Sequence, residues 1–167
     1  GPVRFSEIYH GETIDARRAL EGWTKPDYSD SEWLPVRVAG TKTSNLIATE
    51  NEPIRKKATF APVKIFRTPK GEQVIDFGQN LVGWVEVTAR GKAGDSIRIH
   101  HAEVLDKAGN FYTDNMRAAR TTATYILSGK GTEVFEPHFT FFGFRYIRVE
   151  GYPGELQPGD FRAVAMH

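Results

Sequence analysis

From about residue 63 onward, short apolar runs alternate with turns that contain glycine. The runs are rich in Val, Ile, Phe, Tyr and Thr, and none has the length and 3.6-residue period of an amphipathic helix. We predict strands at 63–68, 73–77, 81–90, 96–105, 121–128, 139–150 and 161–166. This spacing is typical of an all-β antiparallel sandwich or barrel.

The first 60 residues have a different pattern. Two tryptophans, Trp23 and Trp33, and several prolines are scattered through polar sequence, and only residues 15–20 suggest a helical turn. We interpret residues 1–60 as an irregular lead-in arm that packs on a sandwich of residues 61–167. A short turn at 30–33 is expected to bury Trp33, and Tyr28 and Trp23 are expected to lie against that sandwich, because large aromatic side chains gain most from burial.

The alternation along 81–90 places Trp84 on the mostly polar face of its strand. One interpretation is that the arm or a neighbouring loop covers the indole. The other is that Trp84 stays accessible as a partner surface or as a platform on which a sugar ring stacks. The sequence leaves both open.

Segment 139–150 predicts a strand with two apolar faces. A two-layer sandwich buries one face of each strand, so the second cover would come from the arm or from another domain. Arg145 falls within this strand and needs an acidic partner, for which Asp76 is the candidate. The two predicted faces consist of Phe139, Phe141, Ile147 and Val149, and of Phe142, Phe144 and Tyr146.

Charge and composition exclude several classes of partner. The chain has 22 basic and 21 acidic residues, so no strong field favours nucleic acid or anionic lipid. No stretch approaches the roughly 20 apolar residues of a membrane span. Cysteine is absent, which leaves the compartment undecided; the periplasm or the cell exterior is slightly favoured over the cytoplasm for a longer parent protein.

Candidate metal ligands and catalytic groups are sparse. His101 and Glu103 share a predicted strand face, and two ligands do not make a metal site. Oxygen ligands gather near a turn, where Asp and Asn are ordinary turn residues. No spacing marks the carboxylate pair of a glycosidase, so we predict no metal, no cofactor and no catalytic residue here. The turn residues concerned are Asp106, Asn110, Asp114 and Asn115.

Six motifs resemble those of one enzyme family. Residues 74–84 contain Asp-Phe-Gly-Gln-Asn followed by Gly83, and this run resembles the DFGQN-x-x-G signature of bacterial α-L-rhamnosidases. Two positions depart from the family pattern: Ala123, where an acidic residue is common, and Phe142, where a histidine is frequent. The other matches are GE-x-x-DAR at 11–17, HAE-x-L at 101–105, N-x-R at 115–117, EP-x-FT at 136–140 and GFRY at 143–146.

The resemblance implies a concanavalin-like sandwich with its lead-in. In such enzymes this region lies between an upstream jelly-roll domain and a downstream (α/α)6 barrel, and the barrel holds the two acids of an inverting glycosidase. By this resemblance Asp76, Glu103 and Glu136 are not catalytic. A stand-alone rhamnosidase is disfavoured, because the segments that would carry the barrel helices are absent.

Two functions remain from the sequence. The favoured one is a non-catalytic scaffold that orients the barrel, and the alternative is a carbohydrate-binding module that recognises rhamnose or a rhamnoside. We expect Asp76, Asn80 and Arg145 to be structural polar residues. An exposed apolar patch is expected around Trp84 or beside the predicted face of 139–150. Candidate sugar or interdomain contacts are Trp84, Tyr112, Phe142, Phe144 and Tyr146.

Overall fold

Ten strands form the framework in the computed structural model, which describes residues 1–40 and 43–167. Among these residues, helix is limited to four 3-10 turns: η1 (Ala16–Arg18), η2 (Thr43–Asn45), η3 (Asp114–Met116) and η4 (Pro158–Asp160). The strands are β1 (Val3–Glu7), β2 (Gly11–Asp15), β3 (Lys56–Phe60), β4 (Lys64–Arg67), β5 (Gln73–Arg90), β6 (Ser96–Ala102), β7 (Thr122–Ile126), β8 (Thr132–Phe135), β9 (Phe142–Glu150) and β10 (Phe161–Met166).

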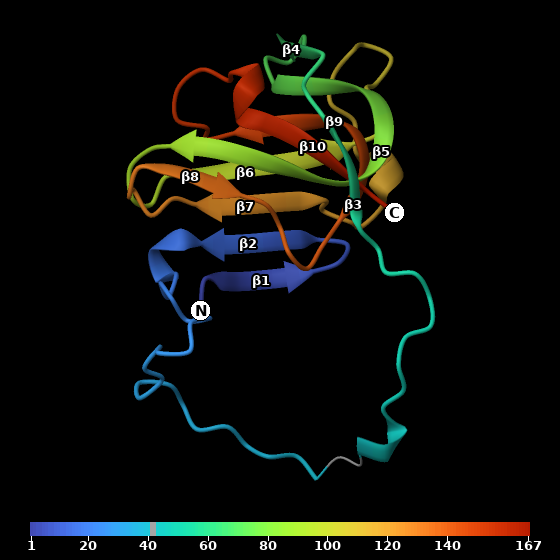
Figure 1. Cartoon of the computed structure of the whole chain (residues 1–167). Coiled ribbons are helices and arrows are strands. Elements are labelled where there is room, and N and C mark those ends of the chain that lie inside the picture. Colours follow the sequence, from blue (N-terminus) through green and yellow to red (C-terminus); the bar gives the residue numbers. More distant parts are fainter. Residues whose placement is uncertain (41–42) are drawn as a thin grey trace.

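The strands make one curled sheet whose two layers enclose the core (Figure 1). The order is β1-β2-β7-β6-β9-β5-β10-β3, and β4 and β8 also pair with β5. The 18-residue β5 joins the layers, because it pairs with β9 through Gly83 and with β10 from Gly83 onward. The predicted all-β sandwich is confirmed.

One pair of strands departs from the predicted antiparallel arrangement. β2 and β7 are parallel, from Gly11 opposite Thr122 to Asp15 opposite Ile126. Parallel neighbours need a crossover connection, and here more than 100 residues separate the two strands. Local alternation carries no information on such a distant pairing.

The main core gathers apolar side chains from both layers. Its members include Ile75, Val85, Ile97, Phe135 and Phe144, and all are almost fully buried. The neighbouring strands β5 and β10 come very close at Gly83. A β-carbon at this position would overlap the carbonyl oxygen of Val164, so only glycine permits the approach.

A second, smaller cluster covers the outer side of β9. Val74, Ala102 and Phe111 are buried there, with Phe66 and Tyr146 packed against them. A single bridge between Leu105 and Phe111 closes the loop above them. The chain's own 103–111 loop therefore supplies part of the second cover that the sequence assigned to an arm or another domain.

The lead-in arm is only partly as predicted. Residues 3–15 form β1 and β2 of the sheet, and η1 matches the helical turn expected near Arg17. The rest leaves the sandwich as a wide loop and returns at β3 (Figure 1). We call residues 20–40 and 43–54 the excursion. The proposed division of the chain at residue 60 stays a prediction.

The two tryptophans of the excursion are not buried as expected. Trp23 is 58% exposed and Trp33 is 48% exposed. The ring of Tyr28 lies 5.8 Å from that of Trp33, so these two aromatics contact each other instead of the sandwich. The sequence showed that these side chains favour burial and could not show which surface would bury them.

Candidate functional site

The DFGQN signature forms a bulge in the middle of β5. Asp76 pairs with Tyr146 and Leu81 with Phe144, so the four residues 77–80 lie opposite Arg145 alone. Gly78 has φ of +83°, a left-handed conformation that favours glycine. Such bulges bend a strand and redirect its side chains. The two runs predicted at 73–77 and 81–90 are therefore one strand.

Asp76 holds this bulge in place. Its carboxylate accepts hydrogen bonds from the Gly78 amide at 2.7 Å and from Nε and Nη2 of Arg145 at 2.8 and 2.9 Å. The expected Asp76–Arg145 pair is therefore present, although the Arg145 side chain is 39% exposed and does not point into the core. The bond from Arg145 lowers the pKa of Asp76, which favours the ionised carboxylate.

Glu103 connects three of the signatures. It accepts from the amide nitrogen of Asn80 at 3.3 Å and from that of Asn115 at 3.1 Å. Asn80 thus has a structural contact of the kind expected from the sequence. A cavity of about 420 Å³ opens beside Glu103 and Asn115, with Tyr9 and Phe141 among its lining residues.

The loop next to this cavity contains two strained residues. Arg117 has φ of +56° and Thr121 has φ of +45°, a region that non-glycine residues rarely adopt. Hydrogen bonds hold Thr121 in this backbone conformation. Its hydroxyl donates to the His101 carbonyl at 3.0 Å, and its own carbonyl accepts from the His101 ring. This anchoring explains how a β-branched residue persists in that conformation.

His101 is a core residue. It is fully buried, stacks on Phe142 with 4.1 Å between ring centroids, and donates from Nδ1 to the Thr121 carbonyl at 2.9 Å. Burial lowers the pKa of the imidazole to about 3. His101 and Glu103 do not converge, because β6 ends at Ala102 between them. Phe142, a departure from the family pattern, is the stacking partner.

Of the suggested oxygen ligands, Asp106 and Asn110 form a turn, whereas Asp114 and Asn115 lie in η3. The Asp106 carboxylate accepts from the backbone amides of Ala108 and Asn110 at 2.9 and 2.8 Å and from the Asn110 side chain. These contacts give Asp106 and Asn110 a structural role. In the described part of the chain no three His, Cys, Asp or Glu side chains are grouped to hold a metal ion. The same residues include no helix long and apolar enough to cross a membrane.

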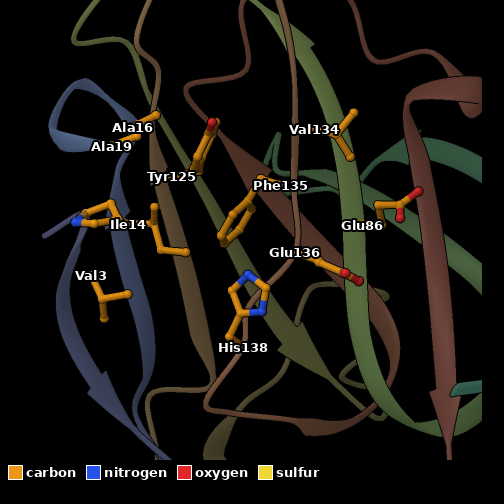
Figure 2. Close-up of a pocket in the computed structure, with 11 residues that line it drawn as sticks. Val3, Ile14, Ala16, Ala19, Glu86, Tyr125, Val134, Phe135, Glu136 and His138 are labelled. Atoms are coloured by element: carbon orange, nitrogen blue, oxygen red, sulfur yellow. The ribbon is translucent and has the colours of Figure 1, made fainter. Parts of the chain in front are cut away.

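A second cavity, of about 380 Å³, lies between β2 and β8 (Figure 2). Ile14, Phe135 and His138 surround its interior, and Glu136 lies at its side. The Glu136 carboxylate accepts from the Trp84 indole at 2.9 Å and from Lys56 Nζ at 2.6 and 2.7 Å. Burial raises the pKa of Glu136, but the bonds from Lys56 and Trp84 outweigh it, so the pKa is lowered.

Trp84 is therefore occupied on two sides. Glu136 accepts the hydrogen bond from the indole N–H, which is the only donor of this side chain, and Lys56 Nζ lies 5.5 Å from the centroid of the Trp84 ring. Lys56 belongs to β3, within the segment that the sequence interpreted as the arm. This contact supports the interpretation in which the arm covers Trp84.

Glu12 was quoted in a motif without a role, and it holds two distant segments together. It is 1% exposed and accepts from the backbone amides of His138 and Phe139 at 3.1 and 3.0 Å. Asp15 of the same motif caps η1 and binds Arg17 with two bonds of 2.8 Å. Both carboxylates therefore have structural roles. The sequence showed the spacing of these two residues in a motif but not their contacts.

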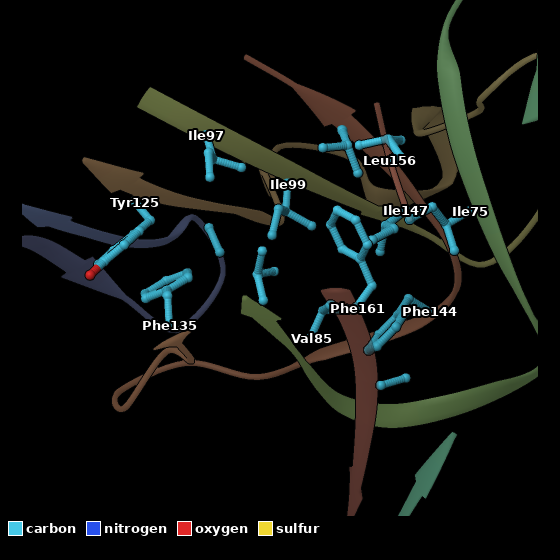
Figure 3. Close-up of a cluster of buried hydrophobic side chains, with 14 of the residues drawn as sticks. Ile75, Val85, Ile97, Ile99, Tyr125, Phe135, Phe144, Ile147, Leu156 and Phe161 are labelled. Carbon is cyan, nitrogen blue, oxygen red and sulfur yellow. The ribbon is translucent and has the colours of Figure 1, made fainter. Parts of the chain in front are cut away.

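Phe142 and Phe144 are not available for the contact role predicted for one face of 139–150. Phe142 and Phe144 are 3% and 0% exposed and lie in the main core, where Figure 3 shows Phe144 beside Val85 and Phe161. Ile147 belongs to the same core, because the β5 bulge shifts the alternation of β9 between Phe144 and Ile147. No patch can therefore form at these phenylalanines.

The remaining contact candidates do not form one site. Tyr146 is half-buried and contacts Arg145, whose guanidinium lies 5.0 Å from its ring centroid. Tyr112 is half-buried beside Leu105, in a cavity of about 500 Å³. Contact roles for Trp84, Tyr112 and Tyr146 stay predictions.

Comparison with known proteins identifies the family. Residues 66–167 match the model of the bacterial alpha-L-rhamnosidase concanavalin-like domain, and residues 1–58 match that of the alpha-L-rhamnosidase N-terminal domain. The chain belongs to the α-L-rhamnosidase family. The family resemblance read from the six motifs is confirmed.

The relatives are much longer than this chain. The alpha-L-rhamnosidase of Streptomyces avermitilis is 40% identical over 168 residues, which cover 100% of this chain and 16% of the relative. That of Alteromonas sp. (strain LOR) is 35% identical over 159 residues, which cover 95% and 17%. The chain thus spans about a sixth of the length of these two relatives.

Solved α-L-rhamnosidases contain the same fold. The crystal structure of the Aspergillus terreus enzyme superposes with a TM-score of 0.94 at 36% identity and covers 100% of this chain and 20% of its own. The Streptomyces avermitilis enzyme, complexed with L-rhamnose, gives 0.94 at 40% identity, with coverage of 100% and 16%.

Proposed function

We propose that this chain is a non-catalytic accessory region of an α-L-rhamnosidase, a hydrolase that removes terminal α-L-rhamnose. Its role is to hold and orient a catalytic domain encoded elsewhere in the same polypeptide. The observation that carries the proposal is the use of the signature carboxylates: Asp76, Glu103 and Glu136 each accept hydrogen bonds from partners within the chain.

These contacts are unsuited to acid–base catalysis. An inverting glycosidase needs a general acid, whose pKa must be raised, and a base that activates water across the scissile bond. The pKa values of Asp76 and Glu136 are lowered, chiefly by Arg145 for Asp76 and by Lys56 and Trp84 for Glu136. Neither carboxyl is prepared to donate a proton near neutral pH.

Sugar stacking has weak support for the same reason. A stacking platform needs an open aromatic face with polar groups beside it. Lys56 lies over the Trp84 ring, and the Glu136 carboxylate accepts the hydrogen bond from the indole N–H. Phe142 and Phe144 are buried. The contacts therefore favour the scaffold role over the carbohydrate-binding alternative.

The proposal is tested with the purified chain. We expect no hydrolysis of an aryl α-L-rhamnoside and no heat of binding on titration with L-rhamnose. The opposite result is turnover that survives repurification and disappears in Glu136→Gln. Saturable rhamnose binding that Trp84→Ala abolishes would instead establish the binding-module function.

A further inference from the structure

The excursion exposes more large apolar side chains than a loop of a folded protein needs. Leu34 is 90% exposed, and Val36 and Val38 are each 88% exposed. Contiguous exposed apolar residues mark interaction surfaces. The other large hydrophobic residues exposed in the excursion are Leu20, Trp23, Trp33, Leu46, Ile47 and Ile54.

Residues 34–38 have the sequence pattern of a strand without a partner. Leu34, Val36 and Val38 alternate with Pro35 and Arg37, the period of two that places one side-chain set on one face. Within the described part of the chain, residues 34–38 make no hydrogen bond to any other segment. Their backbone groups and their apolar face both lack a partner there.

The family match indicates where the partner lies. The N-terminal domain model covers residues 1–58, although β1, β2 and the start of β3 belong to the sandwich. The excursion is therefore the part of the match that the sandwich does not use. The solved relatives are about five to six times longer than this chain, so their structures include residues outside the segment that matches it.

The excursion also has a defined path in those relatives. It holds about a fifth of the residues, and the TM-score averages over all aligned residues. A relative whose equivalent segment followed a different route could not reach 0.94 at 100% coverage. The Glu21–Lys130 ion pair ties the excursion to the sandwich, but residues 34–38 have no such contact among the described residues, so their path in those relatives requires contacts with other parts of the polypeptide.

We propose that residues 34–38 add as an edge strand to a sheet of the N-terminal domain of the same polypeptide, with Leu34, Val36 and Val38 packed on the interior of that domain. The proposal deepens the scaffold function and rests on it, because it assumes that the chain is one region of a longer α-L-rhamnosidase. The segment thereby fixes the orientation of the sandwich relative to the domain before it.

Pro35 determines which edge of the strand is paired. Alternate residues direct their backbone amides to opposite edges of a strand, so the amides of Val36 and Val38 share one edge and those of residues 35 and 37 share the other. Proline has no amide hydrogen, which disqualifies its edge from regular pairing. The strand is consequently an edge strand that pairs only through Val36 and Val38.

Residue-resolved hydrogen exchange tests the pairing in the isolated chain and in the uninterrupted polypeptide. We expect the amides of Val36 and Val38 to exchange at least about 100-fold more slowly in the longer protein, and the Arg37 amide to change little. Equal rates in both proteins would overturn the proposal. Protection in the isolated chain that increases with its concentration would also overturn it, since a second copy would then be the partner.

Matched variants separate packing from pairing. In the uninterrupted polypeptide, Val36→Asp is expected to abolish the protection and lower the melting temperature, whereas Arg37→Ser on the opposite face leaves both unchanged. In the isolated chain neither variant shifts the melting temperature. If Arg37→Ser acts like Val36→Asp, the face assignment is wrong. Hydrolysis by the isolated chain would overturn the scaffold function while leaving these exchange rates as they are, so the two failures are distinguishable.

Discussion

The sandwich and the excursion differ in how far their apolar side chains are buried and their polar groups are hydrogen-bonded. In the sandwich, Phe144 is fully buried and the Glu12 carboxylate, 1% exposed, accepts two backbone amides. In the excursion, Val36 is almost fully exposed, and residues 34–38 make no hydrogen bond to other described residues. The difference teaches that one part of the chain satisfies its own apolar and polar groups, whereas residues 34–38 in the other have no hydrogen-bond partner among the described residues.

The average properties of the chain conceal this contrast. Its hydrophobic content of 40% and its net charge of +1 are those of an ordinary globular domain. Only the exposure of individual residues shows that the excursion carries apolar groups for which the sandwich has no place. Perturbations of the two regions should therefore differ in size and in kind.

Truncation of a core side chain should have the largest effect. Phe144→Ala removes a fully buried ring from the main core and is expected to lower the free energy of unfolding by about 3–5 kcal/mol. Leu34→Ala in the excursion is the matched control, with an expected change within about 0.5 kcal/mol. Denaturant unfolding of the isolated chain measures both. Comparable losses would show that the excursion packs on the sandwich in solution.

Acidification should destabilise the sandwich through His101. The unfolded imidazole has the ordinary pKa of 6.5, and burial lowers the folded pKa to about 3. Between these values the unfolded state binds the extra proton, so stability falls as the pH decreases and is unaffected by His101 above pH 6.5. By pH 5 the loss should reach about 2 kcal/mol.

The His101→Gln variant is the control for this pH dependence. Glutamine keeps a donor for the Thr121 carbonyl and does not titrate. Most of the loss between pH 6.5 and pH 5 should therefore disappear, and the remainder belongs to His100, whose pKa burial also lowers. An unchanged loss in the variant would show that His101 is not the group responsible.

Removal of the charge on Asp76 should have a smaller effect. Asp76→Asn weakens the bonds from Arg145 and Gly78 that hold the β5 bulge, and we expect a loss of about 1 kcal/mol, below the usual range for hydrogen bonds to charged groups because Arg145 is partly exposed. Asp27→Asn in the excursion should change nothing. Thermal unfolding at pH 7 compares the two, and equal melting temperatures would contradict the structural role of the pair.

Cleavage of the excursion should have the smallest effect on stability. Trypsin is expected to cut after Arg37 long before it cuts the sandwich, because residues 34–38 are exposed and unpaired within the described chain. The two pieces should stay together, since β2 in the first piece pairs with β7 in the second. Size-exclusion chromatography of the nicked protein checks this, and separation of the pieces would contradict the assigned topology.

The sequence predicted the sandwich where local alternation was regular. Segment 161–166 coincides with β10, and the hairpin-rich half is all-β as expected. Failures occurred where distant contacts decide the structure. β1 and β2 are short and polar and are strands only because β2 pairs with β7, more than 100 residues away. A local pattern cannot report such a pairing.

At the candidate site, too, some features could be predicted from the sequence and others, which depend on neighbouring or distant strands, could not. The Asp76–Arg145 pair could be predicted, because a charge inside a strand demands a partner. The assignment of Phe142 and Phe144 to an exposed face failed, because a bulge in β5 displaces the alternation of the neighbouring β9. The role of Glu12 was not visible either, since its two donors are backbone amides far along the chain.

The central claim is that the signature carboxylates serve the fold and not the chemistry. The most direct test measures kcat for an aryl α-L-rhamnoside in the uninterrupted polypeptide carrying Asp76→Asn, Glu103→Gln or Glu136→Gln, at a temperature where each variant is folded. We predict lower melting temperatures with kcat within about two-fold of the unmodified protein. A loss of about 100-fold or more in kcat, the size expected for a general acid or base, in a variant that remains folded would contradict the account.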